Sequence, residues 1–250
     1  MRLCVASALL ISVSFLISPA VAGGLGNMTA EEKAAFRAEV RAYLIENPEV
    51  LTEAADVLQA RQDAAAAARD VQLLAENQEA ILNDGVSWVG GNLNGDITVV
   101  EFMDYRCGYC RKAYQEVEEL VKSDGNIRLV LKEYPILGED SVTSARFAVA
   151  VLQLHGGDAY KRAHDALISL RGAPDAATLT RLADSLGLPA QPILDRMMAD
   201  DVTSVLAANQ SLGKVMDISG TPTFVIDQSL LRGYVPLDGM RQIVADERAS

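Results

Sequence analysis

Apolar residues in the first third of the chain recur at helical spacing. Thr29 and Glu32 have the spacing of a capping box, which predicts the start of a helix. One face of this helix carries Phe36, Val40, Tyr43 and Leu44. Asn47-Pro48 ends it and starts the next helix. The narrow apolar stripe then continues through Leu51, Leu58, Ala65, Val71, Leu74 and Ile81. Residues 29–83 are therefore predicted to form two or three helices with no core of their own.

This stripe has two interpretations. Residues 29–83 contain 11 acidic and 5 basic residues, so most of their surface is solvated. They could form a solvated helical arm that folds onto the rest of the chain. We favour an oligomerisation stalk, because a narrow apolar seam needs a partner to cover it.

From Gly85 onward the apolar spacing becomes that of strands. Trp88-Val89 predicts a short strand, and Asn94-Gly95 a turn. Ile97–Phe102 has the near-continuous apolar character of a buried strand. A helix from about residue 108 and a strand over residues 127–133 complete a β-α-β unit. Residues 141–216 are mostly helical by pattern, and a strand at 224–226, a hairpin to 234 and a helix over about 238–248 follow.

The first 22 residues have the layout of a secretory signal peptide. Arg2 precedes an uncharged apolar stretch, and Ala20-Val21-Ala22 is a small-x-small cleavage site. The apolar run is shorter than the ~20 residues that a membrane span needs. We expect cleavage at about Ala22 and a periplasmic or otherwise exported mature protein. Cleavage removes Cys4 and leaves only Cys107 and Cys110.

Composition narrows the function classes. The chain of 250 residues has a formal net charge of −12, which argues against nucleic acid as a partner. It contains three cysteines and two histidines, which leaves little material for a zinc site or a disulfide framework. We therefore expect no metal site and no cofactor beyond a redox-active Cys107–Cys110 pair.

The Cys107-Gly108-Tyr109-Cys110 segment stands where a buried strand ends and a helix begins. A helix N-terminus presents free N–H groups and partial positive charge, which favour a thiolate. Cys107, at the exposed start of the helix, is predicted to attack a disulfide of another molecule. Cys110 is predicted to resolve the mixed disulfide that results. The alternatives are half of a zinc site and an inert structural disulfide. For the zinc site, His155 and His164 are far away in sequence, and we interpret both as ordinary helix residues.

The segment Glu101–Cys110 resembles the active-site strand of DsbA-like exported thiol–disulfide oxidoreductases, which have a thioredoxin fold. Ser219–Thr223 resembles the cis-proline loop of that family. Residues 29–83 resemble the N-terminal oligomerisation region of its ScsC-type (copper-sensitivity suppressor) subgroup. The resemblance implies an α/β protein: a thioredoxin fold with an inserted helical domain, preceded by an α-helical N-terminal arm. The implied domains are a signal peptide (1–22), the arm (23–84) and the DsbA-like domain (85–250), with its helical insertion at about 138–205.

The resemblance also implies residue roles. Pro222 would follow a cis peptide bond, and the backbone of Thr221 would pair with a client strand. Glu101 would be a buried acid that helps move the proton of the resolving thiol. The alternative for Glu101 is a partly exposed glutamate at a strand end. Gly108 and Tyr109 would shape the active site, and Tyr109 lacks the positive charge that a histidine there would supply.

Three functions remain open at this point. We favour a disulfide isomerase or reductase that acts on misfolded or oxidised clients, because the Gly-Tyr dipeptide, Thr221 and the arm resemble that branch of the family. The first alternative is a dithiol oxidase that introduces disulfides. The second, of another class, is a periplasmic copper-binding or copper-stress protein, since paired thiolates suit Cu(I). The expected partners are exported client proteins with cysteines, a membrane thiol–disulfide redox partner and further copies of the chain, bound through residues 29–83.

Overall fold

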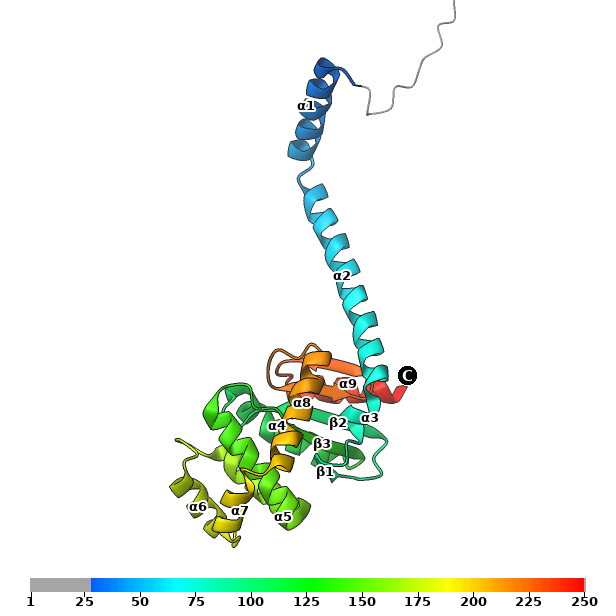
Figure 1. The fold of residues 1–250 in the computed structure, drawn as a ribbon. Coiled ribbons are helices and arrows are strands. Elements are labelled where there is room, and N and C mark those ends of the chain that lie inside the picture. Colours follow the sequence, from blue (N-terminus) through cyan, green and yellow to red (C-terminus); the bar gives the residue numbers. More distant parts are fainter. Residues whose placement is uncertain (1–27, 250) are drawn as a thin grey trace, which may run out of the picture. The chain divides into compact units, whose positions relative to one another are not determined.

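The computed structural model describes residues 28–249 (Figure 1). The predicted signal peptide and Cys4 lie outside the described residues. By its contacts the chain divides after Arg61 into two units, which are described separately below. In the described part, none of the helices combines the length and the apolar character that a membrane span requires.

The N-terminal unit is helical, as the spacing predicts. α1 (Ala30–Glu46) begins at the predicted capping box, in which Thr29 Oγ1 accepts from the Glu32 N–H at 3.2 Å. α2 (Glu49–Glu76) begins directly after Pro48. No residue of α1 is buried, and the apolar face remains open, with Phe36 49% and Tyr43 54% exposed.

The second unit begins within α2, at Gln62, and includes α3 (Gln78–Leu82). Leu74 and Ile81 are buried in a core cluster with residues of the sheet. Asp70 accepts two hydrogen bonds from the Arg232 guanidinium, at 2.7 and 2.8 Å. The apolar stripe predicted as one arm therefore has two environments, because residues 62–82 pack with the sheet.

One mixed sheet organises this unit. Its strands lie in the order β1 (Trp88–Gly91), β3 (Ile127–Glu133), β2 (Ile97–Met103), β4 (Thr223–Ile226) and β5 (Ser229–Arg232). β2 and β3 are parallel, and the other neighbours are antiparallel. β1 pairs with β3 and not with β2, although only a turn separates β1 from β2 in the sequence.

Helices cover both faces of the sheet. α4 (Gly108–Asp124) joins β2 to β3, and α9 (Leu237–Ala249) ends the chain. The odd-numbered residues of β2 and β3, such as Val99 and Leu129, share a core with these two helices and α5. The even-numbered residues, such as Phe102 and Val130, pack against α3 and α8. Buried residues on both faces explain the near-continuous apolar sequence of β2.

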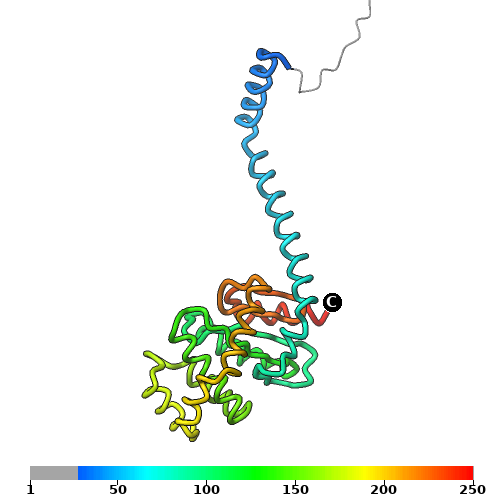
Figure 2. The backbone as a smooth tube through the Cα atoms, viewed as in Figure 1, coloured from blue at the N-terminus to red at the C-terminus, as the bar shows by residue number. Residues whose placement is uncertain are grey.

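A helical insertion leaves the sheet after β3 and returns before β4, as the green-to-orange tube shows (Figure 2). Its helices are α5 (Glu139–Ser169), α6 (Ala176–Ser185), α7 (Ala190–Arg196) and α8 (Asp200–Val215). α5 is kinked at Gly156, where φ is 78°. The observed architecture confirms the predicted α/β class, a thioredoxin fold with an inserted helical domain and a preceding helical arm.

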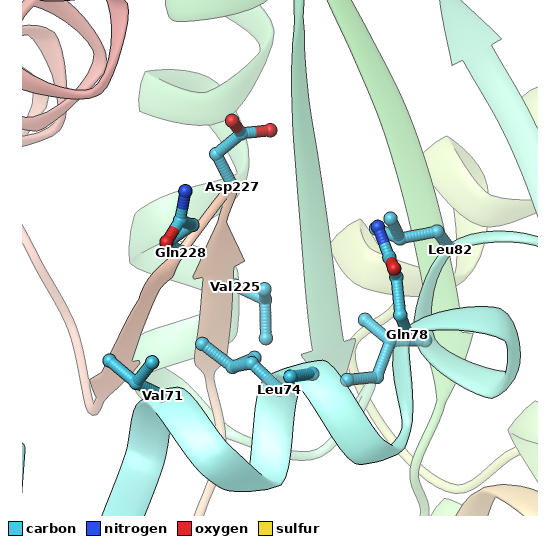
Figure 3. Close-up of a pocket in the computed structure, with 9 residues that line it drawn as sticks. Val71, Leu74, Gln78, Leu82, Val225, Asp227 and Gln228 are labelled. Atoms are coloured by element: carbon cyan, nitrogen blue, oxygen red, sulfur yellow. The ribbon is translucent and has the colours of Figure 1, made fainter. Parts of the chain in front are cut away.

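A small cavity lies between the end of α2, α3 and the β4–β5 turn. Leu74 and Val225 form its floor, and Gln78 and Asp227 stand at its sides (Figure 3). None of the residues that line it is a predicted site residue. The two cysteines lie at the other end of β2, where α4 begins.

Candidate active site

The two cysteines lie at the N-terminus of α4, as the sequence predicts. Cys107 is the N-cap residue, with extended backbone angles, and the helix begins at Gly108. No acidic residue lies in the first turn, so nothing there offsets the partial positive charge of the helix end. Both residues are free thiols, 7% and 1% exposed for Cys107 and Cys110. This position favours a thiolate at Cys107.

The two thiols differ sharply in acidity. The pKa of Cys107 is lowered to about 5, first by a hydrogen bond from Cys110, which outweighs the opposite effect of burial, and also by the N–H groups of Cys110 and Tyr109. The pKa of Cys110 is raised, because its proton is held by Cys107, because it is buried and because Glu101 is near. One thiol therefore ionises readily, and the other keeps its proton.

The loop before β4 lies directly against Cys107. The Thr221–Pro222 bond is cis, as the resemblance implies. The Cys107 thiol donates to the Thr221 carbonyl at 3.1 Å. The Pro222 carbonyl accepts from the Gly233 N–H at 3.0 Å, which ties this loop to the end of β5. Three of the predicted site residues, Cys107, Thr221 and Pro222, are thus brought together from segments more than 100 positions apart.

Glu101 lies on β2 beneath the dithiol and is 5% exposed. Its pKa is raised to about 8, mainly by burial and then by the charges of Cys107, Glu118 and Glu133 in that order. The predicted burial is therefore confirmed, and the alternative of a partly exposed strand-end glutamate is wrong. A carboxyl group with this pKa can take up and release a proton near neutral pH.

Gly108 and Tyr109 form the outer rim. A Cβ atom at Gly108 would have open space around it, so this glycine leaves the surface beside Cys107 uncovered. Tyr109 is 62% exposed, and its ring stacks on Tyr234 with 6.0 Å between centroids. The Lys112 ammonium lies 4.1 Å from the centroid of the Tyr234 ring. The rim is therefore aromatic with one cation.

Asp104 is a site residue that the sequence analysis missed. It is 1% exposed, and its carboxylate accepts from the N–H groups of Arg106, Ile136 and Leu137 at 2.8, 2.8 and 3.1 Å. Its own N–H donates to Cys110 Sγ at 3.5 Å. Asp104 thus joins the cysteine loop to the loop after β3. The Asp-x-Arg turn between strand and helix is the signal that could have indicated it.

A buried polar cluster behind the dithiol was also missed. It consists of Tyr105, Glu133, Tyr160 and His164, all at most 4% exposed. Burial lowers the pKa of His164 to about 4, so this histidine is neutral. The interpretation of His164 as an ordinary helix residue overlooks its contact with Tyr105, because the two residues lie 59 positions apart in the sequence.

Family comparisons cover most of the chain. The family described as "DSBA-like thioredoxin domain" matches residues 98–245. The family described as "Copper resistance protein ScsC N-terminal domain" matches residues 32–65. The first match contains all the predicted site residues, and the second lies within the predicted arm.

Three similar proteins illustrate these matches. A thioredoxin-like oxidoreductase of Silicibacter pomeroyi DSS-3 is 38% identical, with a TM-score of 0.65, over 70% of this chain and 99% of that chain. Proteus mirabilis ScsC in a transitional conformation is 27% identical, with a TM-score of 0.65, over 89% of this chain and 99% of that one. The Na(+)/H(+) antiporter NhaA 1 of Salinispora arenicola is 33% identical over 62% of this chain and 24% of its own length. The chain thus spans about a quarter of the length of the curated relatives it matches.

Proposed function

Because the chain belongs to the family of DsbA-like thioredoxin domains, we propose that it is a protein thiol–disulfide oxidoreductase whose redox-active group is the Cys107–Cys110 pair. The observation that carries the proposal is the contrast between the two thiols. Cys107, with a pKa of about 5, lies against the cis Thr221–Pro222 bond, while Cys110 is buried and protonated. An attacking thiolate and a reserved second thiol are the two requirements of stepwise disulfide exchange.

In the first step the Cys107 thiolate attacks one sulfur of a client disulfide. A bond forms between Cys107 and that sulfur, and the other client sulfur leaves as a thiolate. The Thr221 backbone supports the client segment by strand-like pairing. Only the protonated Cys107 donates to the Thr221 carbonyl, so ionisation of Cys107 frees that carbonyl for the client.

Two routes complete the reaction. In isomerisation, another client thiolate attacks the mixed disulfide and regenerates the Cys107 thiolate. In reduction, Cys110 passes its proton to Glu101 and attacks Cys107, so that the client leaves reduced and a Cys107–Cys110 disulfide remains. The main cause of the raised pKa of Cys110 is its hydrogen bond to Cys107, and this cause disappears once Cys107 is in a mixed disulfide. Cys110 thereby becomes reactive only after Cys107 has bound a client.

We favour the isomerase or reductase direction. The match of residues 32–65 to an ScsC N-terminal domain supports an oligomerisation region, which would gather several dithiols around one misfolded client. The second candidate is a dithiol oxidase. The lowered pKa of Cys107 favours it, because stabilising the thiolate stabilises the reduced enzyme and makes its disulfide a stronger oxidant.

Compartment and partners follow from the same proposal. The segment before Gly23 supports export to the periplasm, with cleavage at about Ala22. The clients are exported proteins with cysteines, and a membrane thiol–disulfide partner resets the dithiol. N-terminal sequencing of the mature protein tests the cleavage position.

Thiol trapping in producing cells tests the direction. Acid quenching followed by alkylation with a mass label separates reduced from oxidised Cys107–Cys110, and a Cys110→Ser variant supplies the single-thiol reference. We expect a mostly reduced pair. A mostly oxidised pair would overturn the isomerase or reductase direction and assign the chain to the oxidases.

A further inference from the structure

Glu133 is a buried ionisable group that the proposed reaction does not use. It is the last residue of β3 and is 4% exposed. Its register partner on β2 is Met103, two positions beyond Glu101. Because side chains alternate along strands, Glu133 and Glu101 project from the same face of the sheet. The core thus contains two carboxyl groups on one face.

Two tyrosine hydroxyls converge on one oxygen of Glu133. Tyr105 and Tyr160 donate to Oε1 at 2.7 and 2.6 Å. The Tyr105 hydroxyl also lies 3.1 Å from Nδ1 of His164. The second oxygen, Oε2, is buried and has no hydrogen-bond partner in the described part of the chain. Such a carboxyl group is poorly solvated, so its ionisation is costly.

The cluster is connected to the dithiol by the chain itself. Tyr105 lies two residues before Cys107, and its carbonyl accepts from the Arg111 guanidinium at 3.0 Å. Tyr160 and His164 belong to α5, in the helical insertion. The Oε1 atom of Glu133 therefore connects three parts of the fold through hydrogen bonds: β3, the cysteine loop and the helical insertion.

The groups that face Glu133 come from every element around it. They are Glu101 of β2, Asp104 and Tyr105 of the cysteine loop, Tyr160 and His164 of α5, and the neutral Asn209 of α8. The pKa of Glu133 is raised to about 8, mainly by burial and also by the charge of Asp104, while the hydrogen bonds from Tyr160 and Tyr105 act to lower it. Glu101 has a pKa of about 8 and is raised in part by Glu133. Two interacting acids of equal pKa titrate as a pair, so a charge on one favours a proton on the other.

We propose that Glu133 is a positioning residue of the dithiol, which acts through Glu101 by its charge and through Tyr105 by its hydrogen bond, and so governs when Glu101 can take the proton of Cys110. This inference rests on the proposed thiol–disulfide exchange at Cys107. An ionised Glu133 makes Glu101 the stronger base, and a protonated Glu133 makes it the weaker one. The electrons and atoms of the exchange are unchanged, because Glu133 only biases the proton transfer.

The test uses the reduced full-length protein and the aromatic disulfide DTNB. Attack by Cys107 releases the first thionitrobenzoate and leaves a mixed disulfide, and attack by Cys110 releases the second. The rate of the second release, measured against pH, reports the proton transfer to Glu101. In Glu133→Gln we expect the midpoint of this profile to move toward acid by about half a pH unit, because the like charge is gone. The profile of the first release should not move.

Glu119→Gln is the matched control, since Glu119 is an exposed carboxylate on α4, and it should leave both profiles in place. An unmoved midpoint in a folded Glu133→Gln protein overturns the inference. If the Glu133→Gln variant does not fold, infrared spectroscopy of the Glu101→Gln variant is used instead, to measure the pH at which Glu133 loses its proton. The remaining buried carboxyl group must then lose its proton at lower pH than in the unmodified protein, and no change overturns the inference.

Cys107→Ser separates the two claims. If this variant still gives the fast first release, the proposed function fails. If it is silent while Glu133→Gln behaves like the unmodified protein, only the role of Glu133 fails.

Discussion

Cys107 and Cys110 have the same side chain and lie three positions apart, yet their environments give them opposite chemistry. Cys107 is the N-cap of α4, where N–H groups stabilise a charge on its sulfur. Cys110 lies one turn deeper, and its proton is held between Cys107 and the charge of Glu101. In the proposed function, the helix start thus supplies the nucleophile, and burial keeps the second thiol in reserve.

The ionisation of Cys107 is directly measurable. We expect the thiolate absorbance of the reduced protein to appear with a midpoint at about pH 5. Cys110→Ala should raise this midpoint, because it removes the hydrogen bond that lowers the pKa of Cys107 most. Thr98→Val, at the far end of β2, is the control. A midpoint near 3.5, the low end for such cysteines, would contradict the expectation that Tyr109 gives weaker stabilisation than a cation.

Glu101 should make stability depend on pH. Its folded pKa of about 8 lies above the ordinary value of 4.5. The unfolded chain therefore releases this proton first, and the folded state loses stability as pH rises from about 4.5 to about 8. Glu101→Gln removes this loss, so at pH 8.5 the variant should be more stable by about 2–5 kcal/mol. Urea unfolding at pH 5 and pH 8.5 measures the difference, and equal gains at both pH values would contradict a raised pKa.

At the scale of elements, β3 places two ionisable side chains of opposite type, Lys132 and Glu133, on opposite faces of the sheet. Lys132 is fully buried beneath α3, where its ammonium donates to Asp84 at 2.5 Å and to the Ala80 carbonyl at 2.7 Å. Glu133 faces α5. The sequence predicts the strand 127–133 correctly, but the polar residues Lys132 and Glu133 at its end would be expected to be exposed. Their burial depends on α3 and α5, which come from before and after the strand, so no local pattern could indicate it.

The contact between Lys132 and Asp84 should hold α3 on the sheet. Asp84→Asn leaves a buried ammonium without its counter-charge, and we expect it to lower the free energy of unfolding by about 3–5 kcal/mol. Asp96→Asn breaks a solvent-exposed pair with Arg248 and should lower the free energy of unfolding far less. Urea unfolding of both variants gives the comparison. Equal small losses would show that α3 does not depend on the buried pair.

At the scale of the molecule, the parts that sequence could predict are those with local signals. The cysteine segment, the Thr221–Pro222 loop and the order of strands and helices were predictable because each has its own motif or period. The pairing of β1 with β3 and the burial of Leu74 and Ile81 were not, since both arise from contacts across the fold. For the same reason, the boundary after Arg61 could not be predicted from the sequence. The apolar stripe continues without a break through residues 29–83, whereas the contacts divide the chain in the middle of it.

The exposed apolar face of α1 should assemble copies of the chain. Phe36→Glu combined with Val40→Glu places charges on this face and should convert the oligomer to monomers. Ala38→Glu adds the same charge on the opposite side of α1 and should leave the oligomer intact. Light scattering after size-exclusion chromatography measures the mass. An unmodified protein that is already monomeric would contradict the proposed role of residues 29–83.

The central claim is that Cys107 attacks client disulfides and Cys110 releases them, and trapping of the mixed disulfide tests it most directly. Purified Cys110→Ser protein, incubated with a disulfide-containing client, should accumulate a covalent complex that mass spectrometry assigns to a Cys107–client disulfide and that a reductant dissolves. Cys107→Ser should accumulate none. A complex through Cys110 in the Cys107→Ser protein, in equal yield, would contradict the account.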